Sequence, residues 1–208
     1  MIIAVDGPAA AGKGTIARAL AQHFNFHFLD TGTLYRRVGL ALLKSNIDPH
    51  DAAAATAIAQ RLNGQKFHDT ELRTEAVAGA ASIVAAIPAV RAALLDFQRA
   101  FAVKLPGTVL DGRDIGTVVC PHAEAKLFIT ASPLVRAKRR FAELRTEGSN
   151  EIFNSVLEDI RQRDARDKTR TIAPLVPAAD AVVIDTSEMT IEAAVAAAIR
   201  AVGRALAS

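Results

Sequence analysis

A glycine-rich segment that ends in lysine lies near the start of the sequence, where residues 7–13 read Gly-Pro-Ala-Ala-Ala-Gly-Lys. It fits the pattern G-x-x-x-x-G-K and lies between an apolar run at 2–5, which we predict as a strand, and a helical period at 15–24. In that setting the backbone N–H groups can surround a polyphosphate, and the Lys13 ammonium can reach its β and γ oxygens. A tight turn with a chance lysine is the alternative. The predicted polyphosphate-binding residues are Gly7, Pro8, Ala9, Ala10, Ala11, Gly12, Lys13, Gly14 and Thr15.

The residue after Lys13 departs from the usual form of this loop. A Ser or Thr commonly stands there and binds Mg²⁺ through its hydroxyl, whereas this chain has Gly14. A magnesium ion should therefore depend more on water and on a distant carboxylate. Asp111 follows a predicted strand at 108–110, and strand C-termini face the ligand crevice in such sheets, so we predict that it helps to hold Mg²⁺ through water. A turn-forming aspartate before Gly112 is the alternative. Without ligand, we expect the Lys13 ammonium to face solvent.

Several longer segments match the signatures of one enzyme family. Residues 12–15 read Gly-Lys-Gly-Thr, the form found in nucleoside monophosphate kinases, and residues 30–36, 111–119, 163–170 and 173–180 closely resemble the motifs of bacterial cytidylate kinases. The resemblance covers nearly the whole chain in the family's order. It implies a P-loop kinase that uses ATP and Mg²⁺ to phosphorylate CMP and dCMP, giving CDP or dCDP and ADP in pyrimidine nucleotide metabolism.

The resemblance also implies which residues bind the 5′-phosphate of CMP. Arg36, Arg113 and Arg170 would hold it, while Thr31 and Tyr35 would line that side of the site. The implied chemistry is reasonable because planar guanidinium groups match phosphate oxygens, and three of them offset a dianion. Any one of these arginines taken alone is more simply an exposed helix residue. Their joint occurrence in matching motifs favours the phosphate site.

The base and sugar contacts come from the same resemblance. Ser82, Arg91 and Asp114 would face the cytosine edge, and Arg163 and Asp167 would face the sugar. Asp167 and Arg163 would then bear on the choice between CMP and dCMP, since dCMP lacks the 2′-hydroxyl group.

A basic helix is predicted from Ser132, and it resembles the start of the lid that covers ATP in this family. Its cations are Arg136, Lys138, Arg139 and Arg140. A lid excludes water and brings cations to the transferring phosphoryl group. We expect in-line transfer without a covalent enzyme intermediate, with catalysis by positioning and charge neutralisation.

The predicted catalytic residues are Lys13, Asp111 and Arg113. One alternative is a P-loop kinase of another small acceptor, although three phosphate-type arginines argue against an acceptor without a phosphate. A second alternative is a GTP-dependent switch. That class expects the segments D-x-x-G and N-K-x-D, and neither occurs in the sequence.

The elements that must position these residues alternate between strands and helices. Further strands are predicted at 27–29, 125–130 and 181–184, which indicates a parallel β-sheet core flanked by helices in the α/β class. We predict one kinase domain, 1–208, with its core at 1–46, 104–131 and 171–208. A mostly helical monophosphate-binding insert occupies 47–103, with a weak strand candidate at 65–68, and a helical lid with basic helices occupies 132–170.

Composition excludes several other classes of protein. The 208 residues are 50% hydrophobic and carry a net charge of +3, with ten basic and seven acidic residues between Arg136 and Arg170. That segment has two aromatic residues, too few for stacking along a nucleic-acid groove. Cys120 is the only cysteine, so no intrachain disulfide can form, and the first residues show no basic leader. We expect a cytoplasmic monomer that binds no nucleic-acid polymer and no membrane.

Overall fold

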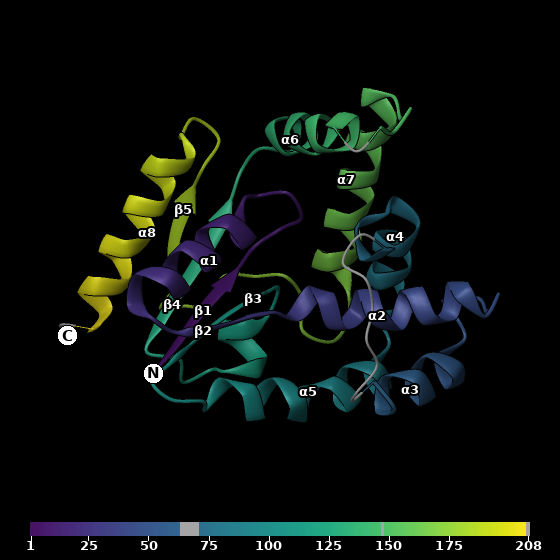
Figure 1. Cartoon of the computed structure of the whole chain (residues 1–208), viewed down its shortest axis with the longest axis horizontal. Helices are drawn as coiled ribbons and strands as arrows, with labels where there is room; N and C mark the ends of the chain where they lie inside the picture. Colours follow the sequence, from purple (N-terminus) through teal and green to yellow (C-terminus); the bar gives the residue numbers. More distant parts are fainter. Residues whose placement is uncertain (63–70, 147, 207–208) are drawn as a thin grey trace. The chain divides into compact units, whose positions relative to one another are not determined.

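The chain folds into two compact units. The computed structural model describes residues 1–62, 71–146 and 148–206 (Figure 1). One unit comprises Met1–Leu29 and Ala102–Ser208, and the other comprises Asp30–Phe101. The second unit begins earlier than the insert predicted from residue 47. The weak strand candidate at 65–68 lies outside the described residues.

The first unit is built on a five-stranded sheet in the order β2-β3-β1-β4-β5, which confirms the α/β prediction. The strands are β1 Ile2–Asp6, β2 His27–Asp30, β3 Thr108–Gly112, β4 Ala125–Thr130 and β5 Val182–Asp185. The pairs β1–β3, β1–β4 and β4–β5 are parallel. With β1 between β3 and β4, the loop after β1 opens at the carboxyl edge of the sheet, where ligands bind in such folds.

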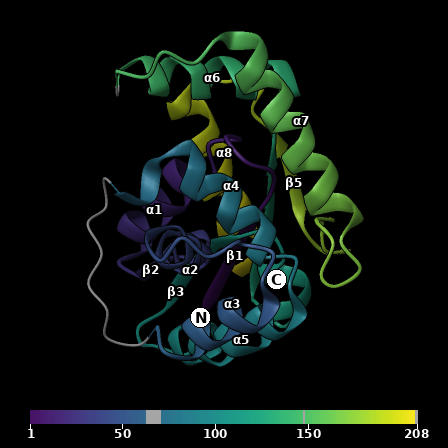
Figure 2. The ribbon, with the colours of Figure 1, turned by 90° about the vertical axis from the view of Figure 1, so that its right-hand side faces the viewer.

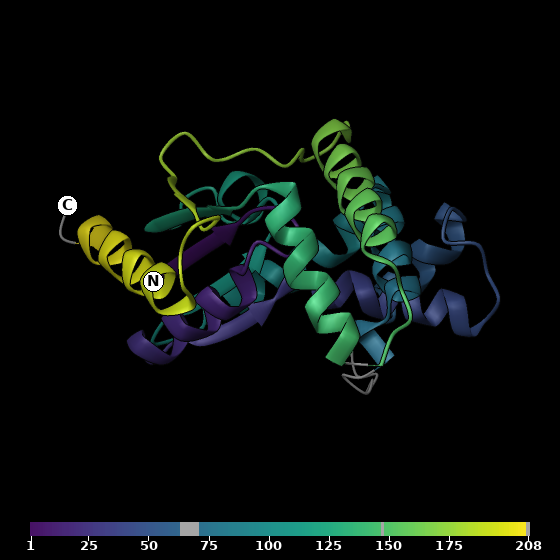
Figure 3. The ribbon, with the colours of Figure 1, turned by 90° about the horizontal axis from the view of Figure 1, so that it is seen from above.

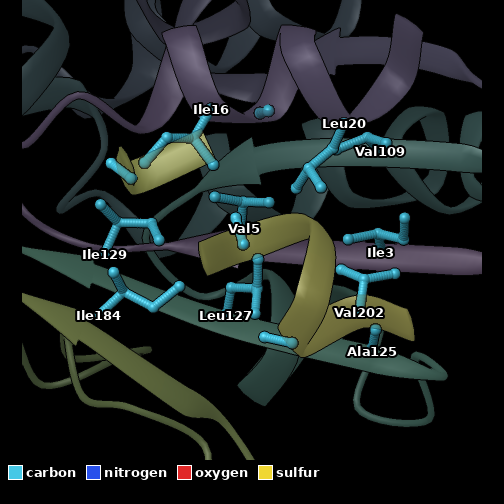
Figure 4. Packing of buried hydrophobic residues seen from close by; sticks show 14 of the residues in the cluster. Ile3, Val5, Ile16, Leu20, Val109, Ala125, Leu127, Ile129, Ile184 and Val202 are labelled. Atoms are coloured by element: carbon cyan, nitrogen blue, oxygen red, sulfur yellow. The ribbon is translucent and has the colours of Figure 1, made fainter. Parts of the chain in front are cut away.

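One hydrophobic core fills the space between the sheet and two of its helices. These are α1 Lys13–Phe24 and α8 Ile191–Leu206, which pack against each other. Ile3 and Val5 of β1 contact this core together with Leu127 of β4, and Leu20 of α1 and Val202 of α8 close it (Figure 4). The apolar run that predicted β1 is thus buried, as expected for a central parallel strand.

Two basic helices complete the first unit. Helices α6 Pro133–Thr146 and α7 Phe153–Thr169 pack against each other (Figure 3). A further short element was not expected from the sequence, a π-helix at Ile115–Val119 directly after β3. Such segments are frequent at functional sites.

The second unit is helical throughout its described residues. It contains α2 Thr31–Lys44, α3 Ala52–Gln60, a 3₁₀ turn Glu71–Arg73, α4 Glu75–Val84 and most of α5 Pro88–Ala102. Helices α2 and α4 lie side by side (Figure 2), and a Cβ atom at Gly39 of α2 would lie 3.0 Å from the Cβ atom of Ala80. Glycine at this position therefore permits the close approach of the two helices.

Within the described residues, no single helix is both long and apolar enough to cross a membrane, and only α4 and α5 taken together, bent by 98°, meet the length and composition test.

Candidate active site

The loop after β1 has the backbone that a phosphate-binding loop requires. Gly7 has a φ of 146°, Gly12 lies in the left-handed region at 87°, and Ala10 also has a positive φ of 57°. A Cβ atom at Gly7 would lie 1.9 Å from the carbonyl oxygen of Ile129, so only glycine fits there. Gly12 is the N-cap of α1 and has no side chain to cap the first helical N–H groups. Those groups and the positive end of the helix dipole are therefore suited to an anion.

Lys13 does not face solvent, and the expectation that it would is wrong. Its side chain is only 6% exposed, and its ammonium donates to the carbonyl oxygen of Pro8 at 2.9 Å. The Asp111 carboxylate lies 3.8 Å from the same nitrogen. The physical reason is the curvature of the loop, which turns a carbonyl group back toward the first turn of α1. The ammonium is thereby held in place before any ligand binds.

Asp111 lies inside β3 and not beyond its end, because β3 continues to Gly112 in register with β1 and Asp111 pairs with Val5. A Cβ atom at Gly14 would lie 3.4 Å from the Asp111 carboxylate, so the position of the missing Ser or Thr hydroxyl is next to this carboxylate. Within the described ranges no group of three or more His, Cys, Asp or Glu side chains could hold a metal ion. One carboxylate fits a Mg²⁺ that takes its other ligands from phosphate oxygens and water.

Asp6, which sequence reasoning missed, is the last residue of β1 and is only 5% exposed. Its two carboxylate oxygens accept hydrogen bonds from the backbone N–H groups of Ile115 at 2.8 Å and of Gly116 at 2.7 Å. Burial raises the pKa of Asp6 to about 7, against the lowering effect of these two hydrogen bonds. The signal in the sequence was an aspartate that ends an apolar strand, but its partners lie more than a hundred residues away.

The loop after β3 and the end of α7 bring four predicted substrate residues together. Arg113 donates from Nε to the Asp167 carboxylate at 3.0 Å, and Arg170 lies 3.6 Å from the Asp114 carboxylate. Arg170 also donates to the carbonyl oxygen of Ala173. Two arginines predicted to hold phosphate thus lie beside two carboxylates predicted to hold sugar and base. Such pairs keep guanidinium groups oriented until an anion arrives.

Arg163 lies on α7 four residues before Asp167, which puts both side chains on one face of that helix. It is half-buried, whereas Asp167 is buried. The predicted sugar contacts therefore share one helix face in the first unit.

The remaining predicted substrate residues belong to the second unit. Thr31 and Tyr35 lie one turn apart in α2, and both are buried. Arg36 follows Tyr35, is 33% exposed and lies 3.5 Å from the carboxylate of Asp30, the N-cap of α2. The Arg91 guanidinium lies 5.8 Å from the centre of the Tyr35 ring, within cation–π range.

Ser82 lies on α4 and Arg91 on α5, and both side chains are buried. Arg91 donates to the carbonyl oxygen of Ala85, between the two helices, at 3.3 Å. The second unit thus brings Tyr35 and Arg91 together.

The cations of the predicted lid have different surroundings. Arg136 is 2% exposed and donates to both carboxylate oxygens of Asp164 at 2.8 and 2.5 Å, and to the carbonyl oxygen of Ala9 at 3.3 Å. Arg139 donates to the hydroxyl and carbonyl oxygens of Thr186 at 3.0 and 2.7 Å. Arg136 therefore joins α6 to α7 and to the phosphate-binding loop, a role that the sequence did not indicate for it or for Asp164. Lys138 is exposed.

Comparison with known proteins shows which family the chain resembles. The chain matches the family model described as cytidylate kinase over residues 3–204. It is 58% identical over 203 residues to a cytidylate kinase of Rhodospirillum rubrum, with 96% of this chain and 95% of the relative covered. A cytidylate kinase of Paramagnetospirillum magneticum is 55% identical over 205 residues, with 97% of each chain covered. The crystal structure of an uncharacterized protein from Eubacterium ventriosum aligns over 98% of both chains with a TM-score of 0.55 and 14% identity, which is a likeness of fold alone.

Proposed function

Because this chain belongs to the cytidylate kinase family, we propose that it transfers the γ-phosphoryl group of ATP to CMP and dCMP, giving CDP or dCDP and ADP. The observation that carries the proposal is the position of Lys13. Its ammonium is held between the carbonyl oxygen of Pro8 and the Asp111 carboxylate, at the start of a helix whose first N–H groups suit phosphate. This is the arrangement that a kinase needs to bind and orient a nucleoside triphosphate.

The donor side of the reaction is assigned to the loop and its neighbours. The backbone N–H groups of residue 7 and residues 9–15 bind the polyphosphate, and Lys13 turns from the Pro8 carbonyl group to the β and γ oxygens. Asp111, together with water and phosphate oxygens, would hold Mg²⁺, and this ion supplies charge neutralisation on the transferring group. Lys13, Asp111 and Arg113 are the proposed catalytic residues. Transfer is in line, so no side chain forms a covalent intermediate.

The acceptor phosphate is assigned to Arg36, Arg113 and Arg170, with Thr31 and Tyr35 beside it. Each of these arginines lies within 3.6 Å of a carboxylate oxygen in the structure. A phosphate dianion competes well for such guanidinium groups because it offers more acceptor oxygens and more charge than one carboxylate. The arginines therefore change partner on binding CMP and do not have to become ordered from solvent.

Base and sugar recognition complete the proposal. Ser82, Arg91 and Asp114 bind the cytosine edge, while Arg163 and Asp167 bind the sugar. Burial of Ser82, Arg91 and Asp114 supports this assignment, because hydrogen-bonding groups shielded from water discriminate strongly between substrates.

We also propose that the enzyme is a cytoplasmic monomer that binds neither nucleic-acid polymers nor membranes. The single cysteine, Cys120, is buried, which fits a reducing compartment. The basic segment from Arg136 to Arg170 has part of its charge occupied by ion pairs, including that of Arg136 with Asp164. Sedimentation of the purified chain measures its oligomeric state directly.

A coupled assay of ADP release tests the function. We expect release of ADP that depends on added CMP and on Mg²⁺, with slow hydrolysis of ATP when no acceptor is present. Cytidine should be a poor acceptor, which would separate this enzyme from kinases of alcohols. ADP release that CMP does not stimulate would contradict the proposal and favour a nucleotide-dependent switch.

Replacing Arg36 with alanine should raise the KM for CMP by about 10-fold or more and lower kcat, since a charge-assisted hydrogen bond to phosphate is lost. The KM for ATP should stay within about 2-fold, because the donor contacts are unchanged. Arg61→Ala is a matched control: Arg61 is an exposed arginine of the same unit and has no assigned role. If Arg36→Ala bound CMP as tightly as the wild type, the phosphate assignment of Arg36 would be wrong.

A further inference from the structure

The segment that carries Arg113 and Asp114 is held at both ends by β1. At one end, Gly112 is still part of β3 and pairs in register with Asp6. At the other end, the N–H groups of Ile115 and Gly116 donate to the Asp6 carboxylate. The two residues between these anchors are Arg113 and Asp114. Asp6 therefore contributes to both anchors, one through its backbone and one through its side chain.

The second anchor is also the start of the π-helix Ile115–Val119, for which Asp114 is the N-cap. The carbonyl oxygen of Asp114 accepts from the N–H groups of Val118 at 2.9 Å and Val119 at 3.1 Å. The Asp6 carboxylate does for Ile115 and Gly116 what a capping side chain does at an α-helix, but from a neighbouring strand. The backbone of Asp114 is thus fixed by its own bonds to the π-helix and by the bonds of Asp6 to the two residues that follow it.

The space around this contact is filled. A Cβ atom at Gly116 would lie 3.4 Å from the Asp6 carboxylate and 3.1 Å from Cδ of Lys126. The ammonium of Lys126 donates to the Asp180 carboxylate and to the carbonyl oxygen of Pro121. The apolar stem of Lys126 is therefore the part that covers Gly116. A shift of the Ile115–Gly116 backbone would therefore have to be transmitted to Asp114 and Arg113, because it has little room elsewhere.

We propose that Asp6 is a positioning residue for the acceptor: its carboxylate fixes the backbone at Ile115 and Gly116 and thereby places Asp114 against the cytosine and Arg113 against the phosphate. The inference rests on the proposed function and deepens it, since it names a residue that sets specificity without touching CMP. Both carboxylate oxygens of Asp6 are used, one as the acceptor for the N–H of Ile115 and the other for that of Gly116. An asparagine at this position has only one acceptor oxygen, so its NH2 group would face one of the two backbone N–H groups and leave that group without an acceptor.

The test variant is Asp6→Asn, measured by steady-state kinetics with CMP, UMP and ATP. We expect the KM for CMP to rise by about 10-fold and the preference for CMP over UMP in kcat/KM to fall by about 5-fold or more. The KM for ATP should change by less than about 2-fold, since the phosphate-binding loop keeps its own backbone contacts. Equal rises in the KM values for CMP and ATP, or unchanged values for CMP, would overturn the proposal.

Ile3→Val is the matched control for loss of stability. Ile3 is fully buried in the same strand, within the core formed with α1 and α8, and removal of one methyl group should lower the thermal midpoint without changing either KM. A second control is the pair Asp114→Asn and Asp6→Asn/Asp114→Asn. If Asp6 acts through Asp114, the double variant should have the CMP preference of Asp114→Asn alone. Additive losses of preference would contradict that route.

Amide hydrogen exchange measures whether Asp6 holds this backbone, whatever substrate the enzyme uses. In the enzyme without substrate, the amide hydrogens of Ile115 and Gly116 should exchange about 10-fold faster or more in Asp6→Asn than in the wild type or Ile3→Val. If wild type does not prefer CMP, the base assignment fails, while exchange still decides whether Asp6 holds this backbone. Unchanged exchange rates would overturn the role of Asp6 even if CMP is the substrate. Should Asp6→Asn not fold, Gly116→Ala gives the same expected increase in the exchange rate of Ile115, because its Cβ atom would lie 3.1 Å from Cδ of Lys126 and displace this backbone.

Discussion

Replacing Lys13 with alanine is expected to lower kcat by at least ~100-fold, the loss typical of a removed group that stabilises transition-state charge. In the structure the Lys13 ammonium lies 3.8 Å from the Asp111 carboxylate and is almost fully buried, so its charge already sits where the polyphosphate is expected. Alanine removes that charge and also leaves the carbonyl oxygen of Pro8 without this donor. The expected result is loss of turnover with a smaller change in the KM for CMP.

Two further variants separate charge from folding. Lys13→Arg keeps a cation but changes its geometry and should retain more activity than Lys13→Ala, because part of the effect is electrostatic. Lys44→Ala removes a lysine that is ion-paired with Glu71 in the second unit and has no assigned role, so its kcat should be near that of the wild type. Thermal unfolding of each variant shows whether the fold persists. Retention of more than about a tenth of wild-type kcat by Lys13→Ala would contradict the charge-stabilising role.

The parallel sheet could be predicted from the sequence because its signals are local. Each strand is a short apolar run beside a turn residue, and helical periods separate the runs, as at β1 and α1. Element ends were less predictable. The strand expected to end at Leu110 continues to Gly112, because Asp111 and Gly112 pair with Val5 and Asp6 of the neighbouring strand. Pairing of this kind depends on a partner that is distant in sequence.

Polar contacts between distant segments account for what the sequence did not predict. The motifs identified Arg113, Asp114, Asp167 and Arg170 as candidates, but the pairing of Arg113 with Asp167 depends on where α7 ends relative to β3. Asp6 and its amide partners are separated by more than a hundred residues. No spacing rule connects them, so only the folded chain shows that they meet.

The surroundings of two charged side chains, Lys13 and Arg136, were also not predictable from the sequence. Lys13 was expected to face solvent, whereas Arg136 was one of four lid cations among which the sequence did not indicate a phosphate contact. In the structure each is almost fully buried, Lys13 beside Pro8 and Arg136 against Asp164. Burial is possible because a carbonyl group or a carboxylate compensates each charge, and this compensation comes from the loop and from α7.

The second large effect is expected in the choice of base: CMP should be used at least ~10-fold more efficiently than UMP, judged by kcat/KM. Cytosine presents an amino donor where uracil presents a carbonyl acceptor. The carboxylate of Asp114 can accept from the amino group but repels the carbonyl oxygen, and Asp114 is only 5% exposed, so water cannot relieve the mismatch. Arg91 would donate to the ring nitrogen that is an acceptor only in cytosine, which reinforces the preference.

Asp114→Asn should narrow the difference between CMP and UMP by about 5-fold or more, because an amide can turn its N–H donor toward the uracil carbonyl group. Asp96→Asn is the matched control: Asp96 is an exposed aspartate of α5 with no assigned role, and its replacement should leave the preference unchanged. The dCMP result depends on the sugar contacts, since Asp167 and Arg163 would lose a 2′-hydroxyl partner. Side-by-side kinetics with CMP, dCMP, UMP and AMP decide the matter. Equal efficiency with UMP, or a preference for AMP, would contradict the cytosine assignment. The assignment of the phosphate-binding loop to kinase chemistry would be unaffected.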